Sequence, residues 1–386
     1  MEKPIATEKV SHYVSDDLTL SILSKLPLKS LKRFSCVRKL WSLLFENPIF
    51  MNVYRNNFIS SDNSYFDEGS CFLLQKDLPY LPYVLDVPEF YLIFGKRFEN
   101  KVKLDWPHLF QGDNQAVHIL GPVINGVVCL YQGQTPCVLL WNPATQESKT
   151  LPSSPTESSI IYEGGTFFYH GFGYDYVRDD YKVIRHVSYR LYLSDFEDDM
   201  EGKPIKVSRD DTWEICSLKS NSWKKLDLDM PICIHAYVGV FVSMKGMCHW
   251  HGDKDGEPSL VSLDLHNEVF YTTPLPSNSW EILRHLMILN ESIALISYYV
   301  GTTTFHISIL GEFSVKESWT ELFIIGHLPY LEHPIGEGNN GDLFFRKKDD
   351  ELVLFNLSTQ MIQELGIKGP RHFCQILIYK ESLYPI

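Results

Sequence analysis

The chain has 386 residues, of which 44% are hydrophobic, and a formal net charge of −13. This length can form one large domain and a small one, and the acidic balance argues against nucleic acid as a partner. The first seventeen residues contain no apolar core, so we expect no signal peptide. The longest stretch without Asp, Glu, Lys or Arg, residues 292–311, is broken by a Tyr pair and a Gly-Thr run, which predicts a hairpin and no membrane contact.

Eight cysteines are spread along the chain, and no two of them form a C-x-x-C pair. They lie mostly within apolar runs, as reduced and buried thiols do. A disulfide framework is typical of secreted proteins, whereas reduced thiols are typical of the cytosol and the nucleus. We therefore expect a cytoplasmic or nuclear protein, or one found in both compartments.

Two helices are predicted at the start of the chain. Ser15 is a favourable N-cap, and the two acidic residues after it lie in the first turn, where the helix dipole favours negative charge. Leu18, Ile22 and Leu26 recur every four residues and so share one helical face. Pro27 cannot continue that helix. A second apolar run at helical spacing then leads up to an Asn-Pro stop and consists of Leu31, Phe34, Val37, Trp41 and Leu44.

The order of residues in this segment resembles an F-box. The residues in register with that family's pattern are Asp17-Leu18, Ile22-Leu23, Leu26-Pro27, Lys29-Ser30-Leu31, Arg33-Phe34, Val37, Lys39, Trp41, Leu44, Pro48 and Phe50. The family usually opens with Leu-Pro where this chain has Val14-Ser15, a departure that weakens the first contact and leaves the others. The resemblance implies docking onto a Skp-type adaptor and, through it, a cullin. The helix-in-groove contacts that it implies, some of which also serve the module's own core, are Leu18, Ile22, Leu26, Pro27, Leu31, Val37 and Trp41.

Charge separates this segment from the rest of the chain. Residues 15–45 contain six basic and two acidic side chains, a net of +4, which leaves −17 for the remainder. A basic N-terminal module would suit an acidic partner, although solvated helix faces are often basic without one. The acidic run at 195–201 is either a flexible loop or a contact for a basic partner.

After the first segment the period changes, and short apolar runs alternate with Gly, Pro, Asn and Asp clusters. One unit recurs, a strand, a polar turn and a second strand that closes on Leu151, Leu226, Leu275, Leu322 or Leu365. The spacings are 75, 49, 47 and 43 residues, and the long one contains the polar stretch Ser188–Asp211, which we interpret as a loop insertion. A strand pair with a turn glycine precedes the unit. Four strands per repeat predict propeller blades, whereas a barrel or a β-sandwich predicts no repeat of this length.

Several strings in this region resemble the plant F-box-associated domain, a kelch-related propeller family. They are NGVVCLY, LWNPATQ, GFGYDYVRDDYKVIR, CHWHG, KESWTEL and FNLSTQMIQELGI. The resemblance covers residues 70–386, and the layout is most similar to S-locus F-box-like proteins, which have an insertion in the same place. One family motif, I-W-V-M, is reduced here to Ser308-Ile-Leu-Gly311, which predicts local repacking.

Strands are left over at both ends of this domain. Residues 373–383 are expected to form one more strand pair, which is too short for a blade, while Cys71–Leu74 and Phe90–Phe94 have no partners of their own. Pairing the two ends would close the ring and leave neither edge exposed. We therefore predict six blades, the sixth shared between the two ends of the domain.

Two clusters could carry chemistry, and for each we favour a structural role. His249 and His251 would lie on one face of a strand and could share a Zn²⁺, but no second ligand pair follows them. Gly171-Phe-Gly173 lacks the helix and lysine of a phosphate loop. The acidic residues after it, Asp175 and Asp179-Asp180, are expected to hold a tight turn through side-chain-to-backbone hydrogen bonds.

Other acidic residues and the absence of a nucleophile motif also argue against catalysis. Asp349-Asp350-Glu351 is predicted to lie solvated in a hairpin turn, and the sequence contains no G-x-S-x-G elbow. We therefore predict no catalytic residue, no bound metal and no cofactor.

These features predict an α+β multidomain protein with an α-helical F-box at 11–55, a linker at 56–69 and an all-β propeller of about six blades at 70–386. The predicted function is the non-catalytic, substrate-recognition subunit of a Skp–cullin–F-box ubiquitin ligase. Its propeller would bind an unknown protein substrate, which is basic if the acidic loop contacts it. Two alternatives stay open: an interaction scaffold without ubiquitin transfer, and a glycan-binding or enzymatic propeller, which would need convergent acids, His or Arg.

Overall fold

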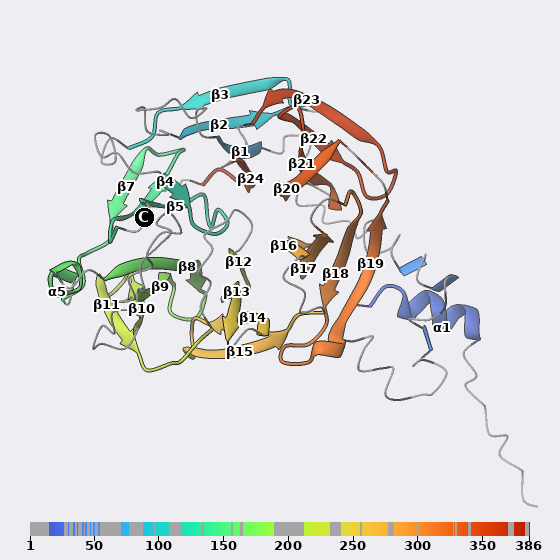
Figure 1. Cartoon of the computed structure of the whole chain (residues 1–386), viewed down its shortest axis with the longest axis horizontal. Coiled ribbons are helices and arrows are strands. Elements are labelled where there is room, and N and C mark those ends of the chain that lie inside the picture. The colour runs from blue at the N-terminus through green and yellow to red at the C-terminus, as the bar shows by residue number, and fades with distance from the viewer. Residues whose placement is uncertain are drawn as a thin grey trace, which may run out of the picture. The chain divides into compact units, whose positions relative to one another are not determined.

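Figure 1 shows a computed structural model of the chain, which describes residues 15–26, single positions and pairs between 30 and 54, and most of 71–386. The longest gaps in the last range are 77–87, 108–116, 189–211 and 232–240. The chain divides into two compact units, Met1–Ser61 and Asp62–Ile386. The domain limits drawn from the sequence, at 55 and 70, stay predictions.

The first unit contains α1 (Asp16–Leu23), which begins where the sequence predicts. Ser15 Oγ accepts a hydrogen bond from the Leu18 N–H at 3.3 Å, which confirms the predicted N-cap. The Ser24 hydroxyl donates to the Ser21 carbonyl at 3.0 Å where the helix ends. Because only isolated positions are described between residues 30 and 54, the second predicted helix stays a prediction, and so does the complete helical F-box.

The second unit is an all-β propeller. In the part of the chain that the structure describes, it has six antiparallel sheets of four strands each, arranged as a ring, which confirms the six predicted blades (Figure 1). In each blade one edge strand lies next to the centre of the ring and the other edge strand lies at its rim.

From the centre outward, the strands of the first three blades are as follows. The closing blade consists of β24 (Cys374–Tyr379), β1 (Cys71–Lys76), β2 (Glu89–Phe94) and β3 (Asn100–Leu104). The next consists of β4 (Val117–Ile119), β5 (Val128–Gln132), β6 (Val138–Asn142) and β7 (Glu147–Thr150). The short helix α5 (Glu157–Tyr162) leads to β8 (Thr166–Asp175), β9 (Asp180–Ser188), β10 (Thr212–Ser217) and β11 (Ser222–Leu226).

The other three blades follow in chain order. One consists of β12 (Phe241–Met244), β13 (Met247–Lys254), β14 (Glu257–Asp264) and β15 (Val269–Pro274). The next consists of β16 (Ile282–Leu289), β17 (Ser292–Tyr299), β18 (Phe305–Leu310) and β19 (Trp319–Ile325), with the 3-10 turn η3 (Lys316–Ser318) before its last strand. The last consists of β20 (Leu331–Glu337), β21 (Leu343–Lys347), β22 (Glu351–Phe355) and β23 (Ile362–Lys368).

The closing blade joins the two ends of the domain, as predicted, but not in the predicted proportion. β24 pairs with β1 in antiparallel register, with Leu377 opposite Leu73 and Ile376 opposite Leu74. Among the residues that the structure describes, the C-terminal segment therefore supplies one strand and not the expected pair. The described part of the N-terminal segment supplies three strands, because β3 extends the sheet beyond the two strands that the sequence indicated.

Each repeated unit forms the two outer strands of a blade, for example β6 with β7 and β10 with β11. The turn glycines lie between the two inner strands, where Asn125 and Gly126 have φ of 51° and 76°, and Lys245 and Gly246 have φ of 50° and 78°. Two consecutive left-handed residues are typical of the tight hairpin turn that matches the twist of the strands. The proposed insertion needs one correction, since Ser188 is the last residue of β9; residues 189–211 lie outside the described part.

The uncharged stretch 292–311 is a strand pair, as predicted. β17 and β18 are antiparallel, with Ala294 opposite Ile309. Among the residues that the structure describes, no helix is long and apolar enough to span a membrane.

Tryptophan side chains link neighbouring blades. Trp223 Nε1 on β11 donates a hydrogen bond to the Pro152 carbonyl at 2.7 Å, and Trp319 Nε1 on β19 donates to the Pro274 carbonyl at 3.1 Å. Both tryptophans are mostly buried, and a buried indole N–H needs such an acceptor. Each follows a serine in the repeated unit, so this part of the repeat marks a contact between blades.

Candidate functional site

Three of the seven predicted adaptor contacts are exposed. Leu18 and Ile22 lie one turn apart on α1, with 54% and 50% of their surface exposed, and Val37 is 72% exposed. Leaving large apolar side chains in water forgoes about 1.5–3 kcal/mol for each one that could be fully buried. The part of the predicted helical face that Leu18 and Ile22 form is therefore open to solvent in this chain.

The other four predicted contacts differ. Leu26 and Trp41 are partly buried, and the Trp41 ring packs edge-on against Phe34 with 6.0 Å between centroids. Pro27 and Leu31 lie outside the described residues. Trp41 thus takes part in the unit's own packing, in line with the expectation that some of the seven serve its core.

Apolar side chains of the same unit are also buried. Leu23 and Leu44 are 5% and 4% exposed, and the rings of Phe50 and Tyr54 stack with 6.0 Å between centroids. Burial raises the pKa of the Tyr54 hydroxyl well above its usual range. The unit therefore has a buried set of apolar residues distinct from the exposed set of Leu18, Ile22 and Val37.

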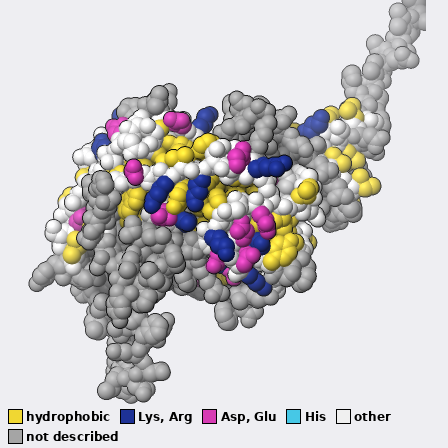
Figure 2. All heavy atoms as spheres, turned by 90° about the horizontal axis from the view of Figure 1, so that it is seen from above, with side chains coloured by type: hydrophobic (Ala, Val, Ile, Leu, Met, Phe, Trp, Pro, Cys, Tyr) yellow, Lys and Arg dark blue, Asp and Glu magenta, His cyan; other side chains and the backbone are white. Residues whose placement is uncertain are grey.

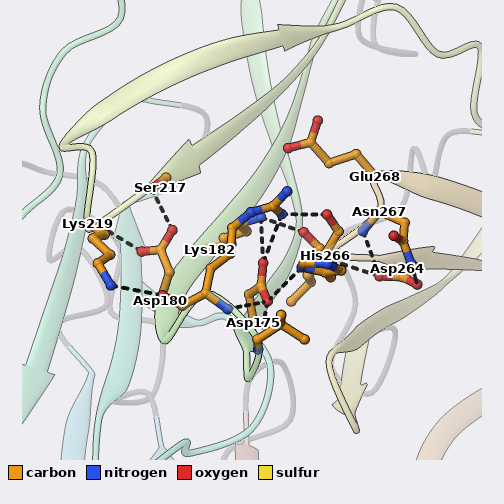
Figure 3. A network of polar contacts seen from close by, with 12 residues as sticks. Asp175, Asp180, Lys182, Ser217, Lys219, Asp264, His266, Asn267 and Glu268 are labelled. Carbon is orange, nitrogen blue, oxygen red and sulfur yellow. Dashed lines mark hydrogen bonds and ion pairs between the residues drawn. The ribbon is translucent and has the colours of Figure 1, made fainter.

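A polar network holds the β8–β9 turn against the next blade (Figure 3). Asp175 Oδ1 accepts hydrogen bonds from the Val177 and Arg178 N–H groups, both at 3.1 Å, which confirms the predicted turn. Its Oδ2 lies 3.1 Å from Lys182 Nζ, and the same ammonium donates to the Leu265 carbonyl at 2.5 Å. Because Leu265 belongs to the adjacent blade, the network joins two blades.

This environment keeps Asp175 ionised. Burial alone would raise the pKa of its carboxyl, but hydrogen bonds from the Arg178 N–H and from Lys182 outweigh burial and lower the pKa to about 2. A general acid or base needs a pKa near the working pH and a free position for the proton. Asp175 has neither, so its role is structural.

The two glycines before this turn allow strands to pack closely. A Cβ added at Gly171 would lie 2.8 Å from Cys248 Cβ, and one at Gly173 would lie 2.8 Å from Cys248 Sγ. Gly171-Phe-Gly173 therefore lies inside β8 and packs against β13 of the next blade. Close strand packing, and not phosphate binding, explains these glycines.

Arg185 is a buried residue whose environment sequence reasoning missed. It is fully buried, with Nη2 2.7 Å from Glu214 Oε2 and its guanidinium 3.8 Å from the centre of the Trp223 ring. These two partners belong to β10 and β11 and follow it beyond the loop at 189–211, whereas Glu157 of α5, with Oε2 3.7 Å from Arg185 Nη2, precedes it. Arg185 is part of the GFGYDYVRDDYKVIR string, but nothing in the string indicates its partners.

His249 and His251 lie on β13, as the strand assignment implies. His249 Nδ1 is 2.8 Å from Ser262 Oγ, and burial lowers the pKa of each imidazole to about 3. Among the described residues no group of three or more His, Cys, Asp or Glu side chains could hold a metal ion. The expected absence of a zinc site stays a prediction that metal analysis can test.

Asp349 and Asp350 lie in the β21–β22 turn, as predicted. Asp350 is not simply solvated, because its Oδ1 lies 2.5 Å from the nearly buried Arg346 Nη1. Asp349 Oδ2 is 3.3 Å from Lys347 Nζ. Both carboxylates thus form ion pairs with basic residues of β21.

The centre of the ring contains a cavity of about 610 Å³. Its walls come from the inner strands β12, β16, β20 and β24 and from the loop that follows β4. Most lining side chains are apolar, and His285, Glu337 and Gln375 are among the polar exceptions. A cavity of this size is within the range of small-molecule sites in proteins, roughly 300–1,000 Å³.

The rim of the ring is charged and mixed. Figure 2 shows Lys and Arg side chains beside Asp and Glu side chains, with hydrophobic atoms between them. On the closing blade Lys103 Nζ lies 2.7 Å from Glu89 Oε1, and Lys101 Nζ lies 3.8 Å from the centre of the Tyr91 ring. Such edge lysines discourage the pairing of an outer strand with another chain.

Comparison with known proteins identifies the family. The profile of the F-box associated beta propeller domain matches residues 107–383, which is most of the chain. The chain belongs to this family. F-box protein CPR1 of Arabidopsis thaliana is 23% identical over 380 residues, covering 91% of this chain and 84% of the relative. F-box only protein 8 of Arabidopsis thaliana is 24% identical over 287 residues, covering 71% of this chain and 84% of the relative.

The match confirms the resemblance to the F-box-associated domain and to plant F-box proteins. The similarity to S-locus F-box-like proteins and the kelch relation stay predictions. Among solved structures, TolB from Acinetobacter baumannii has a TM-score of 0.49 and 10% identity, covering 84% of this chain and 72% of that one.

Proposed function

We propose that this F-box associated propeller protein is the substrate-recognition subunit of a Skp–cullin–F-box ubiquitin ligase. The observation that carries the proposal is the open apolar face of α1, Leu18 with Ile22, in a chain whose propeller belongs to the F-box associated family. An amphipathic helix with an exposed apolar face suits a helix-in-groove contact. In this proposal the adaptor's groove buries that face.

The propeller would hold a target protein close to the ubiquitin-loaded partner enzyme. Such a subunit performs no bond chemistry and acts by raising the effective concentration of the target. Asp175 and Arg185, the buried charged residues described above, form ion pairs within the propeller with Lys182 and Glu214. Because these groups stabilise the fold, they support a binding role for the propeller and not a catalytic one. The six described cysteines are free thiols, which suits the proposed cytoplasmic or nuclear location.

The central test replaces two of the predicted adaptor contacts, Leu26 and Pro27. Replacing Leu26-Pro27 with Ala-Ala should weaken adaptor binding by roughly 2–4 kcal/mol, which is a loss of about 30- to 700-fold in affinity. Co-purification of the full chain with a Skp-type adaptor, followed by a Kd from titration calorimetry, measures this loss. Unchanged binding would contradict the F-box assignment.

A second variant separates binding from folding. Leu18→Ala with Ile22→Ala removes two exposed side chains, so the melting temperature should stay within error while adaptor affinity falls. Ser21→Ala, an exposed position on the same helix, is the matched control and should bind as the unmodified chain does. Equal affinity of the double variant and the Ser21 control would remove the α1 face from the interface.

The scaffold alternative needs a different assay. Reconstitution with the adaptor, a cullin and the ubiquitin-transfer enzymes should yield ubiquitin conjugates on proteins captured by the propeller. Adaptor binding without any conjugate would favour an interaction scaffold. Retention of the chain on immobilised glycans would instead favour the glycan-binding propeller.

A further inference from the structure

The central cavity contains a glutamate with one carboxylate oxygen that is buried and has no hydrogen-bond partner among the described residues. Glu337 is the last residue of β20 and lines the cavity. Its Oε2 atom is buried and has no hydrogen-bond partner among the residues that the structure describes. Leaving a buried carboxyl oxygen without a partner costs about 1–3 kcal/mol, and more when the group is ionised. A group that meets Glu337 from the cavity would remove this cost.

We propose that the central cavity binds a protonated amine or a guanidinium on an apolar stem, with Glu337 as its counter-ion. The proposal does not rest on the ubiquitin-ligase role. It concerns the inner strands of the propeller, whereas adaptor docking concerns the N-terminal unit.

The walls suit such a ligand. Val242 on β12, Ile288 on β16 and Ile378 on β24 line the cavity, are partly exposed and can pack against an apolar stem. Tyr176 lines the same cavity with 64% of its surface exposed, so an aromatic ring is available to a cation. A cation that reaches a carboxyl group in an apolar cavity is held more strongly than one at the protein surface.

The other charged groups at the cavity leave this preference intact. Burial lowers the pKa of His285 on β16 to about 3, so its imidazole is neutral near pH 7 and does not repel a cation. Lys380 and Glu381, which follow β24, both line the cavity and have opposite charges. Asp342, which precedes β21, is not among the lining residues, and its Oδ1 accepts a hydrogen bond from Asn356 Nδ2 at 2.7 Å.

Burial raises the pKa of Glu337 to about 8, although the Ile288 N–H acts in the opposite sense. A cation therefore binds with release of a proton from Glu337 at neutral pH. Because a guanidinium stays charged throughout, its affinity should rise about 25-fold between pH 6.5 and pH 8.5, following the ionised fraction of this carboxyl. His285 has a pKa of about 3, so its charge does not change between pH 6.5 and pH 8.5.

The test is titration calorimetry on the full chain with n-butylguanidinium as the probe and n-butanol as its uncharged control. The unmodified chain should bind the guanidinium more tightly than the alcohol, with the stated rise with pH. Glu337→Gln, which keeps the shape of the side chain, should weaken binding at least tenfold and abolish the pH dependence. Glu257→Gln, at an exposed position at the start of β14, is the matched control and should bind like the unmodified chain.

Other results would overturn the proposal. The first is the absence of binding heat with millimolar n-butylguanidinium at pH 8.5, and the second is equal affinity of the Glu337→Gln chain and the unmodified chain. If that variant does not fold, the deciding result is an affinity of the unmodified chain that does not change with pH. A capped tripeptide with one central Arg separates the possible sources of the cation. Binding of both probes supports a site for a protein side chain, and binding of n-butylguanidinium alone supports a site for a free cationic compound.

Discussion

Replacing Gly336 with alanine should weaken the joint between the closing blade and its neighbour. Gly336 lies in β20, and a Cβ added there would collide with the carbonyl oxygen of Ile376 in β24 and lie 2.9 Å from its carbonyl carbon. Both are backbone atoms of a fully buried residue, so no side-chain rotation can relieve the overlap. Overpacking usually costs 1–3 kcal/mol, and a backbone obstacle puts the expected loss at about 3 kcal/mol.

The measurement is urea unfolding of the full chain, followed by tryptophan fluorescence. Gly326→Ala is the matched control, because Gly326 is exposed and no atom lies within 4 Å of its added Cβ. That control should change the free energy of unfolding by less than about 0.5 kcal/mol. Equal stability of the two variants would refute the close packing of β20 on β24. Deletion from residue 373 onward should destabilise the whole propeller, and a truncated chain with unchanged melting temperature would refute ring closure by β24.

Three further predictions concern buried polar groups. Asp175→Asn leaves Lys182 without its counter-ion and should lower the free energy of unfolding in urea by about 3 kcal/mol. The control Asp349→Asn, at an exposed turn, should lower it by less than about 0.5 kcal/mol, and equal losses would contradict the buried network. Burial lowers the pKa of His249, His251 and His285 to about 3, so the unfolded chain binds more protons than the folded one below pH 6.5, and these histidines should lower the free energy of unfolding by about 4 kcal/mol between pH 7.5 and 5.5. Glu337, whose pKa burial raises to about 8, acts in the opposite sense, so the fall is measured in the Glu337→Gln chain, where a flat profile would contradict the burial of the histidines. His249→Ala with His251→Ala should leave the zinc content, measured by mass spectrometry, at the background level of the unmodified chain, and stoichiometric zinc lost in the variant would overturn the structural role of these histidines.

Local patterns predicted the parts of the propeller that depend on nearby residues. The recurring closing leucines identified the outer hairpins, because an outer strand, its turn and its partner are adjacent in the chain. Asp175 was expected to hold a turn, and its carboxylate accepts two N–H groups within three residues. The ring closure was also predictable, since leftover strands at both ends needed partners.

The remaining features depend on contacts between distant residues. β3 is exposed at four of its five positions, so it lacks the apolar pattern that marks other strands. Glu214, which makes the shortest ion pair of Arg185, lies about thirty residues away, across an insertion whose length gives no register. The central cavity combines Val242, Ile288, Ile335 and Ile376 from four blades. No local pattern can indicate that the ring brings these strands together, or that the Oε2 atom of Glu337 would be buried among them.

The apolar residues of α1 and those of the central blade strands differ in exposure, and this difference decides which substitutions test binding and which test folding. In the propeller, strands such as β5 and β6 are buried along their whole length, so substitutions there reduce stability first. On α1, Leu18 and Ile22 stay half exposed although the helix has only eight residues, too few for stability from its backbone alone. Substitutions at these two positions should therefore change binding and leave the unfolding of the propeller unaffected. Loss of adaptor binding there is evidence about an interface, whereas loss of activity from a blade substitution is evidence about folding until stability has been measured.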